Sequence, residues 1–229
     1  MPGFDLIIYD CDGVLVDSEI IAAQVESELL TEAGFPISVE EMAERFAGLT
    51  WKDILFEVER QSSIPLSARL LDESERLLDI RLAAEVQAID GAMEAILRIP
   101  GPRCICSNST LPRLRTMLAR TGIDRLFGEH VYSARDLGEG RTKPAPDVFL
   151  HGASQFNVKP SGVLVIEDSV HGIHAATAAG MRVVGFTGGS HSFPGHADQL
   201  TEAGAETVIR RMSDLPATVE ALAGWSELL

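Results

Sequence analysis

The sequence contains few cysteines and no long uninterrupted apolar run. Three cysteines are an odd number for a disulfide framework, so we expect Cys11, Cys104 and Cys106 to be reduced and mostly buried. The apolar stretches are only strand-length, and Asp5 and Asp10 interrupt the first ten residues. The sequence therefore predicts neither a membrane span nor a secretory signal, and we expect a cytoplasmic protein.

Basic residues are also scarce. The chain has 19 Lys and Arg residues against 34 Asp and Glu residues, a formal net charge of −15. Nucleic acids and anionic membranes bind basic surfaces, so we expect neither as a partner. The charge fits a soluble acidic protein or one that a divalent metal partly neutralises. The 229 residues are 45% hydrophobic, enough for the core of one domain or of one domain with an insert.

Short apolar runs that are typical of buried parallel strands recur along the chain. They lie at residues 4–10, 103–107, about 130–134, 163–167, 182–187 and 206–210. Helical patterns lie between them, and two of these patterns end before Gly122 and Gly180, which suit helix C-caps. Strands that alternate with helices predict an α/β fold, a Rossmann-like parallel sheet covered on both faces.

Residues 18–87 break this alternation. They contain four helical patterns and no strand-like run; in the first pattern Ile21, Val25 and Leu29 recur at helical spacing before Gly34. Four helices in a row are long for a crossover between strands. We therefore predict a helical domain at residues 18–87. It is inserted after the first strand of a core formed by residues 1–17 and 88–229.

Polar residues follow several of the predicted strands. They are Asp10, Asp12 and Gly13 after the first strand, Ser107 and Asn108 after the second, and Glu167 and Asp168 after the fourth. Lys143 precedes another helical pattern. Taken singly, such residues are typical of turns and helix caps. Because open parallel sheets bind ligands beyond the carboxyl ends of their strands, together they predict a site at one edge of the sheet.

Four segments carry a resemblance to a known family. In order, DCDGVLVDS, CSNST, KPAPD and IEDSVHGIHAATAAGM resemble the four motifs of the haloacid dehalogenase superfamily of phosphotransferases. The helical insert is similar to that family's cap, so the resemblance covers essentially the whole chain. Three segments resemble sequences of one branch of this family, the phosphoglucomutases and sugar-phosphate phosphatases, including phosphogluconate phosphatases: DGVLVDSE, RFAGLT and AIDGA. The resemblance implies an enzyme, a phosphomonoesterase whose substrate is a small phosphate ester.

The resemblance implies a Mg²⁺ site among the carboxylates. Asp10 is then the nucleophile, which forms an aspartyl phosphate, and also a metal ligand. Asp12 is the general acid and base, and its backbone carbonyl binds the metal. Asp168 is a carboxylate ligand, and Glu167 coordinates through water or orients its neighbours. This fits the physics, because a carboxylate approaches a phosphate ester only when cations shield their repulsion, and Mg²⁺ prefers oxygen ligands.

The remaining motif residues are expected to bind the phosphoryl group. Lys143 would lie against Asp10 and neutralise charge on the phosphoryl oxygens, and Ser107 and Asn108 would donate hydrogen bonds to them. Gly13 would allow close approach of the backbone. These cations and donors would explain why a buried strand ends in two carboxylates one residue apart.

The segment RFAGLTWKDI, residues 45–54, is similar to the family's substrate-specificity loop. Arg45 or Lys52 would bind a distal anion or hydroxyl groups of the substrate; the alternative for each is a solvated helix charge. Phosphoglucomutases carry an arginine in this loop that grips a second phosphate, where this chain has Trp51, and a histidine where it has Ala22. Both departures favour a phosphatase acting on a sugar or sugar-acid phosphate over a sugar phosphomutase.

Other interpretations stay open at this point. The phosphomutase is one, and a non-catalytic phosphate-sensing module is another, although such a module needs no helical insert. A dehalogenase would not need Asp12. Four histidines match no zinc-binding spacing, and we expect them to be helix-surface and loop residues: His171, His174, His191 and His196. We expect a monomer or a weak dimer.

Overall fold

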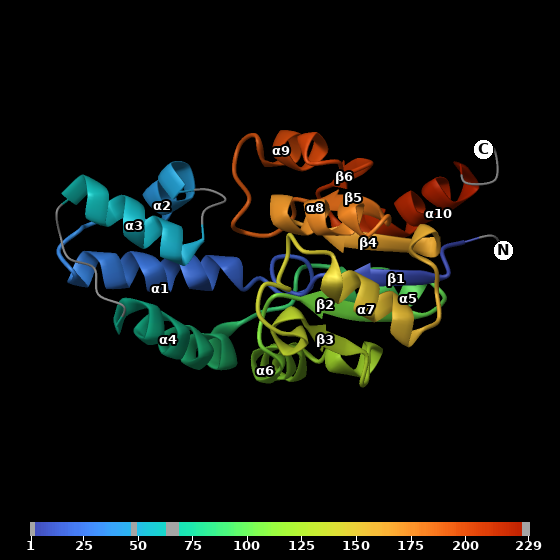
Figure 1. The fold of residues 1–229 in the computed structure, drawn as a ribbon, viewed down its shortest axis with the longest axis horizontal. Helices are drawn as coiled ribbons and strands as arrows, with labels where there is room; N and C mark the ends of the chain where they lie inside the picture. The colour runs from blue at the N-terminus through green and yellow to red at the C-terminus, as the bar shows by residue number, and fades with distance from the viewer. Residues whose placement is uncertain (1–2, 47–49, 63–68, 226–229) are drawn as a thin grey trace. The chain divides into compact units, whose positions relative to one another are not determined.

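A computed structural model describes residues 3–46, 50–62 and 69–225 (Figure 1). The chain divides into two compact units. We call the first the core unit, which comprises Met1–Asp17 and Gln87–Leu229, and the second the helical unit, which comprises Ser18–Val86.

The core unit is built on a six-stranded parallel sheet with the order β3-β2-β1-β4-β5-β6. The strands are β1 (Leu6–Tyr9), β2 (Arg103–Ser107), β3 (Val131–Ser133), β4 (Val163–Glu167), β5 (Arg182–Phe186) and β6 (Thr207–Ile209). At the centre, Ile8 of β1 is in register with Cys104 of β2 and Val165 of β4. The strand order turns back between β1 and β4, which makes this the switch point of the sheet. The structure confirms the predicted Rossmann-like parallel sheet.

Helices cover both faces of this sheet (Figure 1). They are α5 (Ala92–Arg98), α6 (Leu111–Thr121), α7 (Asp147–Gln155), α8 (Val170–Ala178), α9 (His196–Glu202) and α10 (Leu215–Trp225), with short 3₁₀ turns at Asp124–Leu126, Ala134–Leu137, Pro160–Gly162 and Met212–Asp214. Every residue of β1 and β4 is buried, which explains their continuous apolar runs. On one face, Phe149 of α7, Ile173 of α8 and Leu200 of α9 pack against alternate strand residues.

The helical unit contains α1 (Glu19–Glu32), α2 (Val39–Phe46), α3 (Trp51–Ser62) and α4 (Arg69–Glu85). Apolar residues of the first three helices form its core with Ile37: Leu30, Met42, Phe46, Ile54, Leu55 and Val58. Arg81 of α4 reaches α1, where it forms an ion pair with Glu28 at 3.0 Å and a hydrogen bond with Gln24 at 2.8 Å. The unit therefore has an apolar core of its own.

The two segments of the core unit meet where the chain leaves for the helical unit and returns. Val16 and Ala88 form an antiparallel bridge. The backbone N–H of Asp17 donates to Gln87 O at 3.0 Å, and that of Ile89 donates to Leu15 O at 2.9 Å. The departing and returning segments are thus hydrogen-bonded to each other within the core unit.

Two expectations from composition can be compared with the structure. All three cysteines are free and buried, as predicted. Cys104 and Cys106 project from the same face of β2 towards Gly152 of α7, whose missing side chain makes room for both sulfur atoms. Within residues 3–46, 50–62 and 69–225, no helix is both long enough and apolar enough to span a membrane.

Candidate active site

Three carboxylates gather at the switch point of the sheet. Asp10 directly follows β1, Glu167 is the last residue of β4, and Asp168 follows it. The Asp10 N–H donates to Ile166 O at 2.9 Å, which fixes the end of β1 against β4. All three side chains are buried, and each offers an oxygen within 4.8 Å of the others. The carboxyl ends of two neighbouring parallel strands therefore create one oxygen-rich site.

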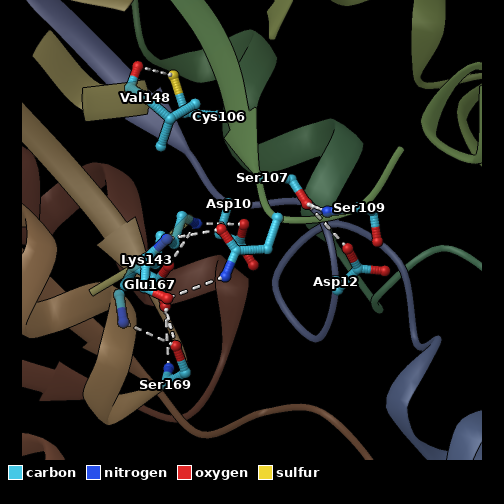
Figure 2. A network of polar contacts seen from close by, with 11 residues as sticks. Asp10, Asp12, Cys106, Ser107, Ser109, Lys143, Val148, Glu167 and Ser169 are labelled. Atoms are coloured by element: carbon cyan, nitrogen blue, oxygen red, sulfur yellow. Dashed lines mark hydrogen bonds and ion pairs between the residues drawn. The ribbon is translucent and has the colours of Figure 1, made fainter. Parts of the chain in front are cut away.

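Lys143 lies between two of these carboxylates. Its Nζ is 2.6 Å from Asp10 Oδ1 and 2.6 Å from Glu167 Oε1 (Figure 2). The Lys143 side chain is only 3% exposed, and its Nζ lies 4.8 Å from the centre of the Phe149 ring. Residues 133 positions apart in the sequence therefore meet in one ion-paired cluster.

The cluster carries excess negative charge. Three carboxylates and one ammonium group give a formal charge of −2 in a buried site. Burial raises the pKa of Asp10 well above its usual value, and the positive charge of Lys143 opposes this shift. Burial also disfavours the charged form of Lys143, but Asp10 and Glu167 together raise its pKa, so the ammonium group stays protonated. A dication would neutralise the remaining charge, and an all-oxygen donor set suits a hard ion such as Mg²⁺.

Glu167 is fully buried, and both of its oxygens have donors. Oε1 accepts from Lys143, and Oε2 accepts from the backbone N–H and the hydroxyl of Ser169 at 2.9 and 3.0 Å. Ser169 is also the N-cap of α8, where its Oγ accepts from the Gly172 N–H at 3.0 Å. A Cβ at Gly172 would overlap the Glu167 carboxylate. These contacts fix the Glu167 carboxylate, and both predicted roles for Glu167 stay predictions.

Asp12 is positioned by a turn rather than by a continuing strand. β1 ends at Tyr9, and the N–H groups of Leu15 and Val16 donate back to Cys11 O. The hydroxyl of Ser107, the last residue of β2, donates to Asp12 Oδ2 at 3.0 Å (Figure 2). Asp12 is half-buried, and its charge adds to the rise of the Asp10 pKa. The two aspartates are therefore close, and Ser107 orients the second.

Asn108 contacts the main chain of Lys143. Its Oδ1 accepts from the Lys143 N–H at 2.8 Å, and its Nδ2 donates to the Lys143 carbonyl at 3.3 Å. The side-chain amide thus spans both backbone groups of that residue. The predicted hydrogen bond from Asn108 to a phosphoryl oxygen stays a prediction, and the contacts assign the side chain a role in holding Lys143.

Gly13 allows the turn after β1 to approach Asp168. Its φ of +70° is in the left-handed region, which L-residues rarely adopt. A Cβ there would overlap Asp168 Oδ2 and lie 2.8 Å from His191 Cε1. The glycine therefore lets the turn approach a carboxylate of the cluster, and the predicted approach of Gly13 to a phosphoryl group stays a prediction.

Two histidines contact Asp168, and the sequence did not predict these contacts. His191 Nε2 lies 3.0 Å from Asp168 Oδ2, and His196 Nε2 lies 2.7 Å from the Asp168 carbonyl oxygen. His191 lies in a loop, as expected, but the expectation is wrong for His196, which is buried at the start of α9 and whose pKa is lowered by burial. Both follow β5, the neighbour of β4, and this position at the same edge of the sheet is the signal in the sequence.

The predicted substrate-binding residues of the helical unit contact other residues of that unit. Arg45 donates to Gln61 Oε1 at 2.8 Å, and its guanidinium lies 5.1 Å from the centre of the Phe46 ring. The Lys52 ammonium lies 5.8 Å from the Phe56 ring. Part of the predicted specificity loop, residues 47–49, lies outside the described residues. Contact of Arg45 or Lys52 with a substrate stays a prediction.

The fold and the carboxylate cluster agree with the comparison to known families. The sequence pattern of the haloacid dehalogenase-like hydrolases matches residues 4–180. The chain belongs to this family, and the predicted resemblance is confirmed.

Three relatives illustrate the similarity. A conserved haloacid dehalogenase-like protein of unknown function from Agrobacterium tumefaciens is 68% identical, with a TM-score of 0.93 over 96% of this chain and 100% of that one. A family hydrolase from Deinococcus radiodurans, solved with bound phosphate and sodium, is 35% identical, with a TM-score of 0.82 over 98% of each chain. The 6-phosphogluconate phosphatase of Escherichia coli is 29% identical over 85% of this chain and 87% of its own.

Proposed function

We propose that this protein is a Mg²⁺-dependent phosphatase that hydrolyses a small sugar or sugar-acid phosphate through an aspartyl phosphate on Asp10. The observation that carries the proposal is the buried contact of Lys143 Nζ with Asp10 and Glu167, at 2.6 Å each, beside Asp168. Such a cluster suits a nucleophilic carboxylate that meets a multiply charged phosphate.

The metal would be held by Asp10, Asp168 and the backbone carbonyl of Asp12. The buried charge of −2 and the all-oxygen donors fit this assignment. When bound, Mg²⁺ would neutralise charge on the phosphoryl oxygens beside the Asp10 carboxylate. Lys143 would supply the second cation, since its raised pKa keeps it protonated.

The chemistry uses two aspartates in sequence. An Asp10 carboxylate oxygen attacks phosphorus, the bond from phosphorus to the ester oxygen breaks, and Asp12 gives its proton to that oxygen. Water then attacks the phosphorus of the aspartyl phosphate, Asp12 takes its proton, and inorganic phosphate leaves with the Asp10 carboxylate regenerated. Ser107, which donates to Asp12 Oδ2 at 3.0 Å, would keep Asp12 turned towards this reaction.

Two relatives and one position in the helical unit support the proposed substrate class. The relative named 6-phosphogluconate phosphatase acts on a sugar-acid phosphate, and the D. radiodurans hydrolase binds phosphate. Trp51, which takes the place of the phosphomutase arginine, packs against the apolar core of the helical unit. This position supplies no cation for a second phosphate, which favours hydrolysis over phosphoryl transfer within one sugar. We assign residues 18–87 as the cap that selects the leaving group.

The test is hydrolysis of an aryl phosphate by the wild type and by Asp10→Asn, with Mg²⁺ and with a chelator. We expect both chelation and Asp10→Asn to lower kcat about 10³-fold or more, since each removes a part on which the first step depends. Asp5→Asn, an exposed aspartate at the other end of β1, is the matched control and should keep full activity. Activity of chelated Asp10→Asn at the wild-type level would contradict the proposal.

A panel of sugar and sugar-acid phosphates then identifies the substrate. For a phosphatase, free phosphate appears at the rate of substrate loss. A phosphomutase would instead form an isomeric sugar phosphate faster than free phosphate.

A further inference from the structure

We propose that His191 is a positioning residue that orients the Asp168 carboxylate for a divalent metal ion. The inference rests on the metal site of the proposed function and adds to it a residue outside the four motif segments. His191 lies in the segment at residues 187–195, which we call the β5–α9 loop because it joins β5 to α9.

The first observation is the contact with the carboxylate itself. His191 Nε2 is 3.0 Å from Asp168 Oδ2, and the Asp168 side chain is only 7% exposed. We assign the ring hydrogen to Nε2, which then donates to Oδ2. A donor on one oxygen restricts the rotation of the carboxylate and leaves the other oxygen, Oδ1, available to a metal. Partners of this kind orient metal-binding groups and raise metal affinity.

The second observation is that the same loop and the start of α9 hold the main chain of Asp168. His196 Nε2 is 2.7 Å from the Asp168 carbonyl oxygen. A carbonyl only accepts, so Nε2 carries the hydrogen, and His196 Nδ1 accepts from the Ser192 hydroxyl at 3.1 Å. One stretch of chain therefore contacts both the side chain and the backbone of Asp168.

The third observation is that the loop is fixed near His191. The Ser190 N–H donates to Asp17 Oδ1 at 3.0 Å, and its hydroxyl donates to Oδ2. A Cβ at Gly189 would lie 2.7 Å from His191 Nδ1 and 3.1 Å from Gly13 O, so glycine lets the loop pass this closely. With the loop held in this way, little conformational freedom remains to be lost when a metal binds.

The experiment is a calorimetric titration of the full-length protein with Mg²⁺. We expect His191→Leu to weaken Mg²⁺ binding about 10- to 100-fold, the usual cost of losing such a partner. His191→Gln, whose side-chain Nε2 can still donate, should stay within a few-fold of the wild type. His174→Leu, which changes an exposed histidine of α8, is the matched control and should bind as the wild type does. If His191→Leu does not fold, as judged by circular dichroism, His191→Ala makes the same comparison.

Two further readouts separate positioning from a general structural effect. In aryl phosphate hydrolysis, His191→Leu should need about 10- to 100-fold more Mg²⁺ for half-maximal rate, yet reach nearly the wild-type kcat at saturation. A structural defect would instead lower kcat at every Mg²⁺ concentration. With Mn²⁺ as the probe, electron spin echo modulation should show no directly bound nitrogen, and a directly bound nitrogen would overturn the positioning role.

The outcomes distinguish this inference from the proposal on which it rests. A wild-type protein that does not bind Mg²⁺ overturns the metal site and the inference together. If the wild type binds Mg²⁺ and His191→Leu binds it with equal affinity, the inference alone is overturned.

Discussion

Both the side chain and the backbone of Lys143 are held by polar contacts. Its ammonium group contacts Asp10 and Glu167, and its backbone N–H and carbonyl contact the side chain of Asn108. A shift of the Lys143 backbone would therefore move its ammonium group relative to the carboxylates of Asp10 and Glu167. Because small displacements of reacting groups are costly in catalysis, the amide of Asn108 should matter through its hold on Lys143 as well as through any contact with the substrate.

Replacement of Asn108 by alanine tests this role. Asn108→Ala removes both contacts with the Lys143 backbone, and we expect kcat for phosphate ester hydrolysis to fall about 10- to 100-fold. Ser109→Ala is the matched control, because the Ser109 backbone N–H that donates to Ser107 is retained. Equal kcat values for Asn108→Ala and Ser109→Ala would show that the amide does not position Lys143.

The predictable part of the site consists of residues at strand ends. Asp10, Ser107 and Asp168 could be grouped from sequence because the carboxyl ends of neighbouring parallel strands meet at one edge. The contacts of His191 and Asn108 could not, because they depend on the paths of two loops in space. A histidine in a glycine- and serine-rich loop gives no signal of its own, and only its position after β5 relates it to Asp168.

At the scale of elements, the start of helix α8 is built around the end of strand β4. Ser169 caps the helix and donates to Glu167, and Gly172 leaves room for the Glu167 carboxylate. Glycine weakens a helix by about 1 kcal/mol relative to alanine. Here the absence of a side chain at Gly172 lets the first turn of α8 lie directly against the Glu167 carboxylate at the end of β4.

The steric role of Gly172 can be measured as a free energy of unfolding. Gly172→Ala should lower it by about 1–3 kcal/mol, because the new methyl group overlaps Glu167 in a closely packed site. The matched control is Gly224→Ala in α10, where a Cβ meets no atom within 4 Å and alanine should be neutral or stabilising by up to about 1 kcal/mol. Urea unfolding of both variants checks this, and a stabilising Gly172→Ala would contradict it.

Helix α1 carries a carboxyl group with a perturbed pKa. Burial raises the pKa of the half-buried Glu26 to about 8, and the charge of Glu19 adds to this effect. In the unfolded chain the pKa is near 4.5. Between these values the folded state binds more protons than the unfolded state, so the free energy of unfolding falls as pH rises from about 4.5 to 8.

Comparison of variants isolates this contribution of Glu26. We subtract the unfolding free energy of the wild type from that of Glu26→Gln at each pH. This difference should increase by about 1–3 kcal/mol from pH 5 to pH 8.5, because an amide does not ionise. Glu32→Gln, an exposed change on the same helix, is the control and should follow the wild type. Urea unfolding at the two pH values gives the difference, and equal pH dependence in all three proteins would rule out the shift.

The predictability of elements depended on their length and on their apolar pattern. The four central strands, β1, β2, β4 and β5, were identifiable because burial on both faces makes them continuous apolar runs. Three helices were not predicted, at Ala92–Arg98, His196–Glu202 and Leu215–Trp225. The first two span only about two turns, and HADQLTE has a single large apolar residue, so its periodicity cannot be recognised.

At the scale of the whole molecule, metal binding should contribute to stability. The buried cluster has a formal charge of −2, and any ion that binds only the folded state stabilises it by mass action. At Mg²⁺ concentrations of about 100 Kd this amounts to about 2.7 kcal/mol.

Thermal unfolding provides the measurement. We expect Mg²⁺ at this concentration to raise Tm by about 5–10 °C over the chelated protein. Asp168→Asn should abolish the increase, whereas Asp136→Asn, an exposed control, should retain it. An unchanged Mg²⁺ effect in Asp168→Asn would exclude Asp168 as a ligand.

The hydrogen-bonded pair of segments at Val16 and Ala88 also bears on how this family diversifies. Because the residues on either side of the insertion are already paired, a much shorter or a different connection could join them with little loop-closure entropy. Substrate preference could then change by exchange of the whole insertion, while the hydrolytic residues of the sheet keep their sequence and their spacing.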